Sequence, residues 1–330
     1  MPDQLKKNAD IDVSIAQNFH TLAGRDLLRL LDLTPAEFQL VVDTAAKQKA
    51  DWAQGIHEAP CAGQSVAIIL EKPSLRTRNS FEVGTYRLGA HPVVMDDDHS
   101  AFSRGETVQD TTLVLERFVD AIVIRTFEQT KVEEIAEWAS IPVVNALTDD
   151  FHPCQGLADA LTIREHKGKL EGLTLAYVGD GNNMANTYME LGALAGMHVK
   201  LGCPETHMPD PDVLAECLEA APATGATIEV FNTAQEAVAG ADVVLTDTWT
   251  SMGDEAEHDQ RLKEFEGFQV DSALMALAAD DAIFMHCLPA HRGEEVTDEV
   301  IDGAQSVIYD EAENRLHAQK ALLSLVMGAA

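Results

Sequence analysis

The feature that most constrains the fold of this chain is a regular alternation of short apolar runs with segments of helical pattern. The apolar runs are rich in β-branched residues and predict buried strands. Because such strands alternate with helices at a regular spacing, we expect an α/β fold with mostly parallel sheets and helices on both faces. The expected strands cover residues 65–70, 92–95, 121–124, 141–146, 173–178, 198–203, 228–231, 242–246 and 282–285.

Helix signals occupy several of the intervening segments. The segment 22–49 has a helical pattern, and within it Thr34 is followed by Pro35 and by Glu37. These residues are an N-cap, a first-turn proline and a capping-box acid. With 330 residues, the chain is long enough for two domains. Further helices are expected at about 77–88, 108–118, 157–166, 212–220, 234–239 and 315–330.

One stretch between an expected strand and an expected helix carries recognisable chemistry: residues 72–78, Lys-Pro-Ser-Leu-Arg-Thr-Arg. Pro73 ends the strand, and Ser74 is a favourable N-cap. The first-turn amides of a helix lack partners within the helix and lie at the positive end of its dipole. With Arg76 and Arg78 in the same turn, the pattern predicts an anion site, best suited to a phosphate. The alternative is an ordinary helix start with solvated arginines.

The overall charge narrows the class of partner. The chain has 55 acidic and 23 basic residues, which give a formal net charge of −32. Because this field repels phosphate backbones and anionic lipids, we expect no nucleic acid and no membrane as partners. The acids are spread along segments with folded patterns, as expected for a halophile whose salt-loaded cytoplasm screens their repulsion. A site for an anion must therefore create its positive potential locally.

Polar motifs follow several other expected strands. Arg125 ends one of them, where open α/β sheets place ligand contacts, although an arginine in solvent is an equal alternative. In the segment 152–155, His-Pro-Cys-Gln, an imidazole can donate to a carbonyl oxygen and a glutamine can accept from an amide nitrogen. Residues 179–183 read Gly-Asp-Gly-Asn-Asn, residues 247–253 read Asp-Thr-Trp-Thr-Ser-Met-Gly, and residues 286–289 read His-Cys-Leu-Pro.

In order and in type, these motifs resemble those of the aspartate/ornithine carbamoyltransferase family. Ser-x-Arg-Thr-Arg is similar to the family's phosphate loop, and His-Pro-x-Gln and Gly-Asp-x-x-Asn also match. Asp-x-x-x-Ser-Met-Gly and His-Cys-Leu-Pro resemble the ornithine enzymes of the family. The resemblance implies an α/β fold of two doubly wound domains with parallel sheets, joined by interdomain helices.

The resemblance also implies domains, an assembly and a reaction. Residues 1–150 would bind carbamoyl phosphate, with a helix at about 315–330 packing back on them, and residues 151–314 would bind ornithine. The assembly would be a homotrimer or a multiple of trimers, with active sites between subunits. The reaction would convert carbamoyl phosphate and L-ornithine to L-citrulline and phosphate, in arginine synthesis or in the catabolic direction of the arginine deiminase pathway.

The same resemblance implies a role for individual residues. Thr77, Arg125, His152 and Arg315 would surround the carbamoyl oxygen, where negative charge builds in the transition state. The expected catalytic residues are Arg125, His152, Asp247, Cys287 and Arg315. The expected carbamoyl-phosphate-binding residues are Ser74, Leu75, Arg76, Thr77, Arg125, His152, Pro153, Cys154, Gln155, Cys287, Leu288 and Arg315. The expected ornithine-binding residues are Asn183, Asp247, Ser251 and Met252.

Three other functions remain as alternatives. A carbamoyltransferase could act on another amine, such as putrescine or an acylated ornithine, although Ser-Met-Gly argues against both. A nicotinamide dehydrogenase would need a third glycine where the chain has Met184. A non-catalytic anion-binding protein is disfavoured because the groups for both substrates are intact, apart from Ala101 in place of the family's loop glutamine.

No cofactor and no metal are expected. His152, His286, Cys287 and His291 could cluster, but adjacent His-Cys ligands without a second paired motif make a poor tetrahedral set. Five cysteines form no Cys-x-x-Cys pair, and their odd number argues against a disulfide framework. The first twelve residues lack a secretory signal, and no apolar run reaches the roughly 18 residues of a membrane span. We therefore expect a cytoplasmic protein.

Overall fold

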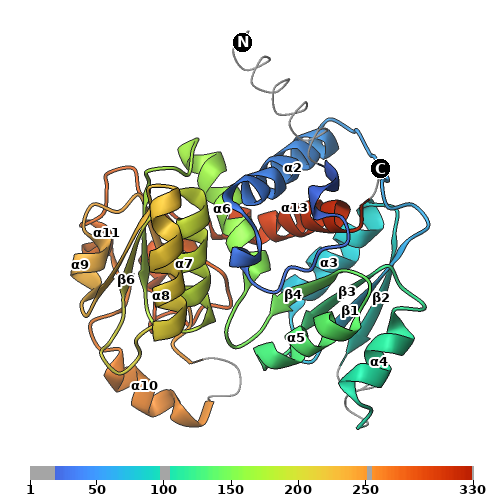
Figure 1. The fold of residues 1–330 in the computed structure, drawn as a ribbon. Helices are drawn as coiled ribbons and strands as arrows, with labels where there is room; N and C mark the ends of the chain where they lie inside the picture. Colours follow the sequence, from blue (N-terminus) through green and yellow to red (C-terminus); the bar gives the residue numbers. More distant parts are fainter. Residues whose placement is uncertain (1–18, 97–104, 251–254, 329–330) are drawn as a thin grey trace. The chain divides into compact units, whose positions relative to one another are not determined.

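The computed structural model describes residues 19–96, 105–250 and 255–328 (Figure 1). Its contacts divide the chain into unit 1, Met1–Leu161 with Asn314–Ala330, and unit 2, Thr162–Glu313. Each unit contains one parallel sheet, of four strands in unit 1 and five in unit 2. The expected α/β fold with two parallel sheets is therefore confirmed. The division between the units falls within two helices, α6 (Pro153–Lys167) and α13 (Ile308–Val326).

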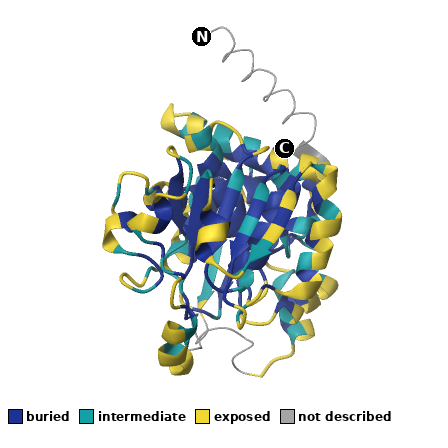
Figure 2. Cartoon of the chain, turned by 90° about the vertical axis from the view of Figure 1, so that its left-hand side faces the viewer, coloured by how far each residue is buried: buried dark blue, intermediate teal, exposed yellow. Residues whose placement is uncertain are grey.

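The sheet of unit 1 has the strand order β2-β1-β3-β4. Its central strands are buried over nearly their whole length, which is why they read as continuous apolar runs and not as alternating patterns. Figure 2 colours the residues by burial and shows buried residues in the interior and exposed ones on the outer helices and loops. Leu70, the last residue of β1, lies opposite Arg125, the last residue of β3. The strands are β1 (Ser65–Leu70), β2 (His91–Asp96), β3 (Ala121–Arg125) and β4 (Val143–Leu147).

The helices of unit 1 begin where the sequence carries capping residues. Thr34 and Glu37 form the expected capping box, in which the Thr34 amide donates to Glu37 Oε2 at 2.8 Å. Ser74 is the N-cap of α3, since its Oγ accepts from the Thr77 amide at 3.1 Å. The helices are α2 (Pro35–Ala53), α3 (Leu75–Arg87), α4 (Val108–Leu115), α5 (Gln129–Trp138) and the unit 1 parts of α6 and α13.

The expected helix across residues 22–33 is wrong. The segment contains a short 3-10 turn, η2 (Leu30–Asp32), after another, η1 (Phe19–Leu22). Leu27 instead extends along β4, where its amide donates to the Val143 carbonyl at 2.9 Å. The carboxylate of Asp26 accepts from the Val143 amide at 2.7 Å. These contacts with the sheet override the local helical pattern.

The sheet of unit 2 has the order β7-β6-β5-β8-β9. Helix α7 packs on β5, β6 and β7, and α8 packs beside it; α9 contacts the same three strands (Figure 1). The strands are β5 (Thr174–Val178), β6 (His198–Gly202), β7 (Thr227–Phe231), β8 (Val243–Thr246) and β9 (Ile283–His286). The helices are α7 (Asn183–Ala195), α8 (Pro211–Ala220), η5 (Ala221–Ala223), α9 (Ala234–Val238), η6 (Glu255–Glu257), α10 (His258–Glu264), α11 (Ser272–Met275) and α12 (Asp298–Ile301).

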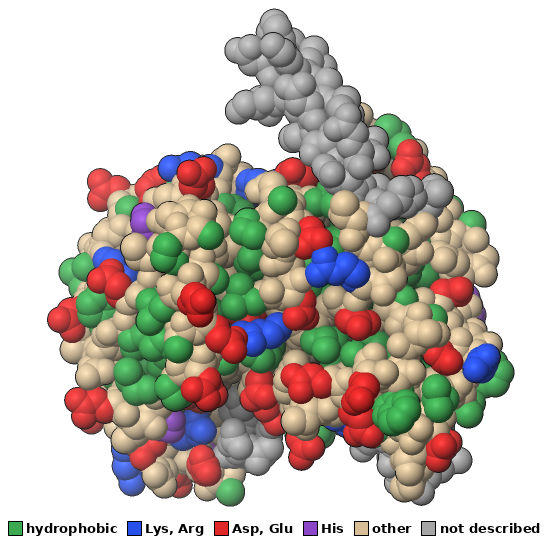
Figure 3. Space-filling model, viewed as in Figure 1, with side chains coloured by type: hydrophobic (Ala, Val, Ile, Leu, Met, Phe, Trp, Pro, Cys, Tyr) green, Lys and Arg blue, Asp and Glu red, His purple; other side chains and the backbone are tan. Residues whose placement is uncertain are grey.

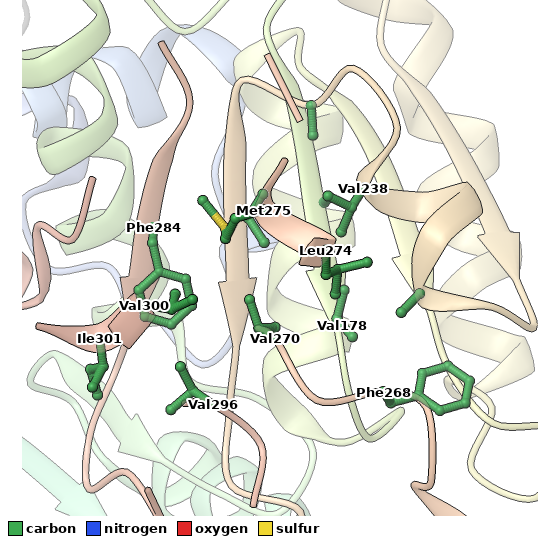
Figure 4. Close-up of a cluster of buried hydrophobic side chains, with 14 of the residues drawn as sticks. Val178, Val238, Phe268, Val270, Leu274, Met275, Phe284, Val296, Val300 and Ile301 are labelled. Atoms are coloured by element: carbon green, nitrogen blue, oxygen red, sulfur yellow. The ribbon is translucent and has the colours of Figure 1, made fainter. Parts of the chain in front are cut away.

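A buried apolar cluster holds the strands of unit 2 to the helices of one face. Phe284 of β9 lies near Val300 and Ile301 of α12, and Leu274 of α11 lies near Val178 of β5 (Figure 4). Burial of each such side chain contributes about 1.5–3 kcal/mol to folding. This packing fixes β5, β8 and β9, whose carboxyl ends carry the polar motifs of this unit.

The surface carries the acidic excess. Figure 3 shows acidic side chains spread over the face in view, among basic, polar and apolar ones. None of the helices among the described residues is long and apolar enough to cross a membrane.

Candidate functional site

In each unit, the polar motifs lie where the strand order reverses. In unit 1 the chain passes from β1 outward to β2 and then returns to the other side of β1 as β3; in unit 2 it passes from β5 through β6 to β7 and returns beside β5 as β8. Open α/β sheets bind ligands outside the carboxyl ends of strands at such a reversal. The topology therefore predicts one binding position next to β1 and β3, and another next to β5 and β8.

The turn after β1 presents backbone amides and charge. The backbone of Ser74 is extended, with φ −157° and ψ 118°, and α3 begins at Leu75. The Leu75 side chain is 75% exposed, so the contribution of this residue to an anion is its first-turn amide. Thr77 is buried, whereas Arg76 is half-buried in the same turn.

Two buried arginines converge on the side chain of Thr77. Arg125 Nη1 lies 3.5 Å from Thr77 Oγ1, and Arg315 Nη2 donates to the same oxygen at 3.3 Å. Arg315 Nη1 also donates to Gln155 Oε1 at 2.7 Å. The pairing of β3 with β4 shifts register between Ile124 and Arg125, an irregularity of the kind that redirects a strand-end side chain. Arg125 is buried, which excludes the alternative of a solvated arginine.

His152 lies within the electrostatic reach of these arginines and is itself buried. Burial lowers the pKa of its imidazole well below the usual value, and the positive charges of Arg315, Arg125 and Arg76 lower that pKa further. The imidazole is therefore neutral near pH 7, with one N–H group to donate. A neutral donor beside three fixed positive charges suits a polarised carbonyl oxygen.

The other residues of the His-Pro-Cys-Gln segment shape the start of α6. Pro153 is the first residue of that helix. The Cys154 thiol donates to the Asn145 carbonyl at 3.3 Å, and burial raises its pKa to about 12. The side chain of Cys154 is thus directed to β4, so any ligand contact of this residue is made by its backbone. Gln155 Nε2 donates to Asp159 Oδ1 at 2.8 Å.

Two other cations of the phosphate-loop motif have carboxylate partners. Arg78 Nη1 donates to Asp96 at 2.8 and 2.9 Å, and its side chain is 44% exposed. Lys72 pairs with Asp149, and its ammonium lies 4.2 Å from the centre of the Phe127 ring.

The site residues of unit 2 centre on Asp247, just after β8. Its Oδ1 accepts from the Cys287 thiol at 3.1 Å and from the Thr248 amide at 2.8 Å. Its Oδ2 accepts from Asn182 Nδ2 at 3.2 Å. A thiol that donates to a carboxylate is protonated, so this geometry presents Cys287 as a hydrogen-bond donor and not as a thiolate.

Helix α7 begins beside this carboxylate. Asn182 is its N-cap, with Oδ1 accepting from the Met184 amide at 2.9 Å, and Asn183 is its first residue. Asn183 thus occupies the positive end of a thirteen-residue helix, which suits a carboxylate ligand. Asn183 is predicted from its motif but Asn182 is not, although asparagine is a favoured N-cap and its position before α7 indicates one.

A second carboxylate, Asp180, is held by a cation. Arg261 Nη1 donates to Asp180 Oδ2 at 2.6 Å and to the Trp249 carbonyl at 3.0 Å. Burial raises the pKa of Asp180, while Arg261 and His207 oppose that shift. The positive charge of Arg261 therefore compensates the negative charge of Asp180, the second carboxylate near Asp247. Arg261 lies on α10, 81 residues after Asp180, so the sequence alone does not indicate this pairing.

The His-Cys-Leu-Pro segment is supported by a buried network that no sequence motif indicates. His286 Nδ1 accepts from the Leu288 amide at 2.9 Å, so the neutral ring carries its proton on Nε2, which lies 3.1 Å from Glu295 Oε1. Glu311 accepts from the His286 amide at 2.8 Å. Leu288 adopts φ +59°, a conformation uncommon for this residue type. The network holds Cys287 and Leu288 in a defined turn after β9.

Two groups among the described residues could supply metal ligands: Asp247 with His286 and Cys287, and His291 with Glu294 and Glu295. In the first group, the Cys287 thiol donates to Asp247 and His286 Nδ1 accepts from the Leu288 amide. These hydrogen bonds occupy the atoms that a metal would need. Ser251 and Met252, expected to bind ornithine, and Ala101 lie outside the described residues.

Comparisons with known proteins agree across the chain. Residues 25–165 match the family model for the carbamoyl-P binding domain of aspartate/ornithine carbamoyltransferase, and residues 171–326 match that for its Asp/Orn binding domain. The ornithine carbamoyltransferase of Symbiobacterium thermophilum is 52% identical over 93% of this chain and 99% of its own length. That of Acidothermus cellulolyticus is 53% identical over 91% of this chain and 95% of its own. The structure of ornithine carbamoyltransferase from Pyrococcus furiosus matches with a TM-score of 0.91 and 47% identity, covering 94% of this chain and 99% of that one.

Proposed function

Because this chain belongs to the aspartate/ornithine carbamoyltransferase family, we propose that its two units divide the two substrates of one reaction between them. The reaction is that of an ornithine carbamoyltransferase: the carbamoyl group of carbamoyl phosphate passes to the side-chain amine of L-ornithine, giving L-citrulline and phosphate. The observation that carries the division is the opposite charge of the two positions. Unit 1 has Arg76 in the first turn of α3 and Arg125 at the end of β3, whereas unit 2 has the carboxylate of Asp247 directly after β8.

Unit 1 binds carbamoyl phosphate. The first-turn amides of α3 at Leu75 and Arg76 and the guanidinium of Arg76 hold the phosphate, with Ser74 and Thr77 shaping the turn. Each charge-assisted hydrogen bond of this kind is worth about 1.5–3 kcal/mol. The turn supplies the local positive potential that a chain with a net charge of −32 otherwise lacks.

A second group of unit 1 residues binds the carbamoyl oxygen. Arg125, Arg315 and neutral His152 donate toward it, and their hydrogen bonds strengthen as attack on the carbon places negative charge on the oxygen. Gln155 is held in place by Arg315 and Asp159 and orients the carbamoyl nitrogen. In unit 2, the Leu288 carbonyl and Cys287 complete the set proposed for this substrate.

Unit 2 binds ornithine. Its α-carboxylate lies at the start of α7, where Asn183 and the helix dipole favour an anion. Asp247 binds an ammonium or amine group of the substrate, and the Asp180–Arg261 pair keeps a second carboxylate from competing for it. Ser251 and Met252 are proposed contacts of the same substrate.

The attacking group must be the neutral amine. With a pKa near that of lysine, about 10.4, deprotonation near pH 7.4 costs about 4 kcal/mol. Asp247 and the Cys287 thiol position the amine for attack on the carbamoyl carbon. The new C–N bond forms, the bond between that carbon and the phosphate oxygen breaks, and the amine proton leaves with the phosphate. Cys287 forms no covalent bond in this scheme.

We propose that the chain assembles as a trimer or a multiple of trimers. Large apolar side chains are exposed in unit 1 on α3 and just after α4: Leu75 is 75%, Tyr86 74% and Phe118 73% exposed. Exposed apolar groups of this kind mark interaction surfaces. Leu75 belongs to the phosphate turn itself, so a subunit covering it would lie beside the proposed donor site.

The direct test is citrulline formation from carbamoyl phosphate and ornithine in molar KCl, with putrescine as the competing acceptor. We expect citrulline and phosphate in equal amounts and slow or absent reaction with putrescine. Faster carbamoylation of putrescine would contradict the proposed acceptor. We further propose a salt-loaded cytoplasm as the setting, and loss of activity on dilution from KCl, reversed by its return, is the result expected from an acidic, self-repelling surface.

A further inference from the structure

One arginine of the proposed donor site is held by a residue that neither the motifs nor the comparisons assign. Gln319 follows Arg315 by one turn of α13 and is buried, as is Arg315. A guanidinium has only donors, so the amide atom facing it is the glutamine oxygen. In this orientation Gln319 Oε1 accepts from Arg315 Nη2 at 2.9 Å and from Arg315 Nε at 3.0 Å. Two donors of one guanidinium thus meet a single acceptor.

The other end of the same amide reaches α3. Gln319 Nε2 donates to the Ser80 hydroxyl and to the Arg315 carbonyl, the latter at 3.2 Å. The Ser80 hydroxyl lies 2.7 Å from the Arg76 carbonyl and 3.2 Å from the Thr77 carbonyl. Gln319 therefore joins the guanidinium on α13 to the first turn of α3, the two elements that supply the proposed donor site.

The two helices pack closely at this point. A Cβ atom added to Gly84 of α3 would lie 3.5 Å from Leu316 and 3.6 Å from Lys320, the residues that directly follow Arg315 and Gln319. The short separation lets one glutamine side chain span from helix to helix. Because buried side chains hold low-energy rotamers in a packed interior, the position of this amide is set by both helices.

We propose that Gln319 is a positioning residue for Arg315: its neutral amide fixes the guanidinium toward Thr77 and Gln155 and leaves the positive charge available to carbamoyl phosphate. This inference rests on the proposed role of Arg315. A carboxylate at the same place could accept the same hydrogen bonds, but it would form an ion pair and cancel that charge. An apolar side chain would remove one acceptor from two donor atoms of a buried guanidinium.

Three variants separate these effects. Gln319→Leu removes the acceptor and should lower kcat/KM for carbamoyl phosphate by about tenfold to a hundredfold. Gln319→Glu keeps the acceptor but neutralises the charge, so it should raise KM for carbamoyl phosphate and weaken inhibition by inorganic phosphate, with a smaller change in kcat. Ser80→Ala removes the hydroxyl that accepts from Gln319 and bonds within α3, leaves both donors of Arg315 their acceptor, and should have the mildest effect.

Gln48 offers a matched control in the same unit. Its Nε2 donates to the Ser324 hydroxyl at 2.9 Å, so Gln48→Leu also removes a glutamine–serine hydrogen bond between helices, α2 and α13. We expect this variant to have unchanged KM and kcat. Equal kinetic losses in Gln48→Leu and Gln319→Leu would reduce Gln319 to a structural role and overturn the proposal.

A double-mutant cycle with Arg315→Met is the decisive measurement. If Gln319 acts through Arg315, adding Gln319→Leu to Arg315→Met should cause no further loss in kcat/KM. Additive losses, or wild-type kinetics in Gln319→Leu, would overturn the inference while leaving the role of Arg315 intact. Full activity of Arg315→Met alone would instead contradict the proposed function of Arg315. If Gln319→Leu does not fold, the same cycle with Gln319→Glu decides the matter. If the effect of this carboxylate comes from pairing with Arg315, it should disappear in the Arg315→Met background.

Discussion

The two candidate positions of this chain share a topology and differ in charge. In both units the candidate position lies beside the reversal of a parallel sheet, next to the amino end of a helix that begins with a polar N-cap, Ser74 or Asn182. At the end of the neighbouring strand, unit 1 places Arg125, whereas unit 2 places Asp247 immediately after β8. The fold thus determines where a ligand can bind, and the residue at the strand end determines the charge of the group that binds there.

The two positions also differ in how their charge responds to protons. Unit 1 uses guanidinium groups, which stay charged at every accessible pH, and His152, whose lowered pKa keeps it neutral. Unit 2 uses a carboxylate hydrogen-bonded to a thiol. This difference matches the two tasks: a donor site needs constant positive charge for its phosphate, and an acceptor site needs groups that can share a proton with an amine.

The largest expected effect comes from removing a charge of unit 1. Arg125→Met should lower kcat/KM by about a thousandfold, since removal of one donor to a developing oxyanion costs about 2.7–4 kcal/mol. Steady-state kinetics with both substrates measure it. Arg117→Met is the control in the same unit, because the Arg117 side chain is 76% exposed, with its Nε 3.6 Å from Glu116 Oε1. Equal losses in the two variants would mean that Arg125 has no special role.

The next effect separates the two substrates. Asp247→Asn removes the negative charge of unit 2 and should lower kcat/KM for ornithine by about a hundredfold, as expected for losing a charge-assisted contact. Inhibition by inorganic phosphate should stay within about twofold, because the proposed phosphate contacts lie in unit 1. Asp259→Asn, an exposed acid of α10, should leave both quantities unchanged. A large change in phosphate inhibition in Asp247→Asn would break the division between the units.

A smaller effect tests the thiol. Cys287→Ala removes the donor to Asp247 and should lower kcat by about tenfold, the value of one hydrogen bond of ordinary strength. Cys287→Ser keeps a donor and should recover most of that loss. Near-normal turnover of the alanine variant would remove Cys287 from the proposed scheme.

The smallest effect concerns stability and tests the neutrality of His152. The pKa of His152 in the folded protein is lowered from 6.5, the value expected in the unfolded chain. Below pH 6.5 the unfolded chain therefore takes up a proton that the folded protein does not. The free energy of unfolding is unaffected by His152 above that pH and falls as the pH decreases below it. Between pH 6.5 and 5.5 this linkage should cost about 1 kcal/mol of unfolding free energy. Urea unfolding of the protein and of His152→Gln at both pH values measures it. The same pH dependence in both would show that His152 is not the group responsible.

The strands could be predicted well from the sequence because they are fully buried. Their apolar runs are short, continuous and rich in β-branched residues, so the expected 141–146, for example, is observed as Val143–Leu147. Helix starts were predicted where a cap is present, as at Thr34 and Ser74. Two helices were missed for different reasons. Helix α5 follows Glu128, which makes no side-chain cap bond. Helix α7 has a cap at Asn182, but it is buried on nearly every side and has no polar face to give it an amphipathic pattern.

The candidate site residues also divide into those that a local sequence pattern predicts and those that it does not. Residues in a motif after a strand, such as Arg125 and Asp247, could be predicted because parallel strands bring their carboxyl ends to one edge of a sheet. Gln319 and Arg261 could not, because their importance depends on the partner that tertiary packing gives them. No local pattern distinguishes a buried glutamine next to an arginine from one in an ordinary helix.

The most direct test is a crystal structure with a bisubstrate phosphonate, in which a mimic of carbamoyl phosphate is joined to ornithine. The account predicts the phosphonate at the first-turn amides of α3 with the Arg76 guanidinium, the carbonyl oxygen at Arg125 and Arg315, and the ornithine end at Asp247 and the start of α7. A phosphonate lodged elsewhere, or its contacts exchanged with those of the amino acid, would contradict the assignment of a cationic donor site to unit 1 and an acidic acceptor site to unit 2.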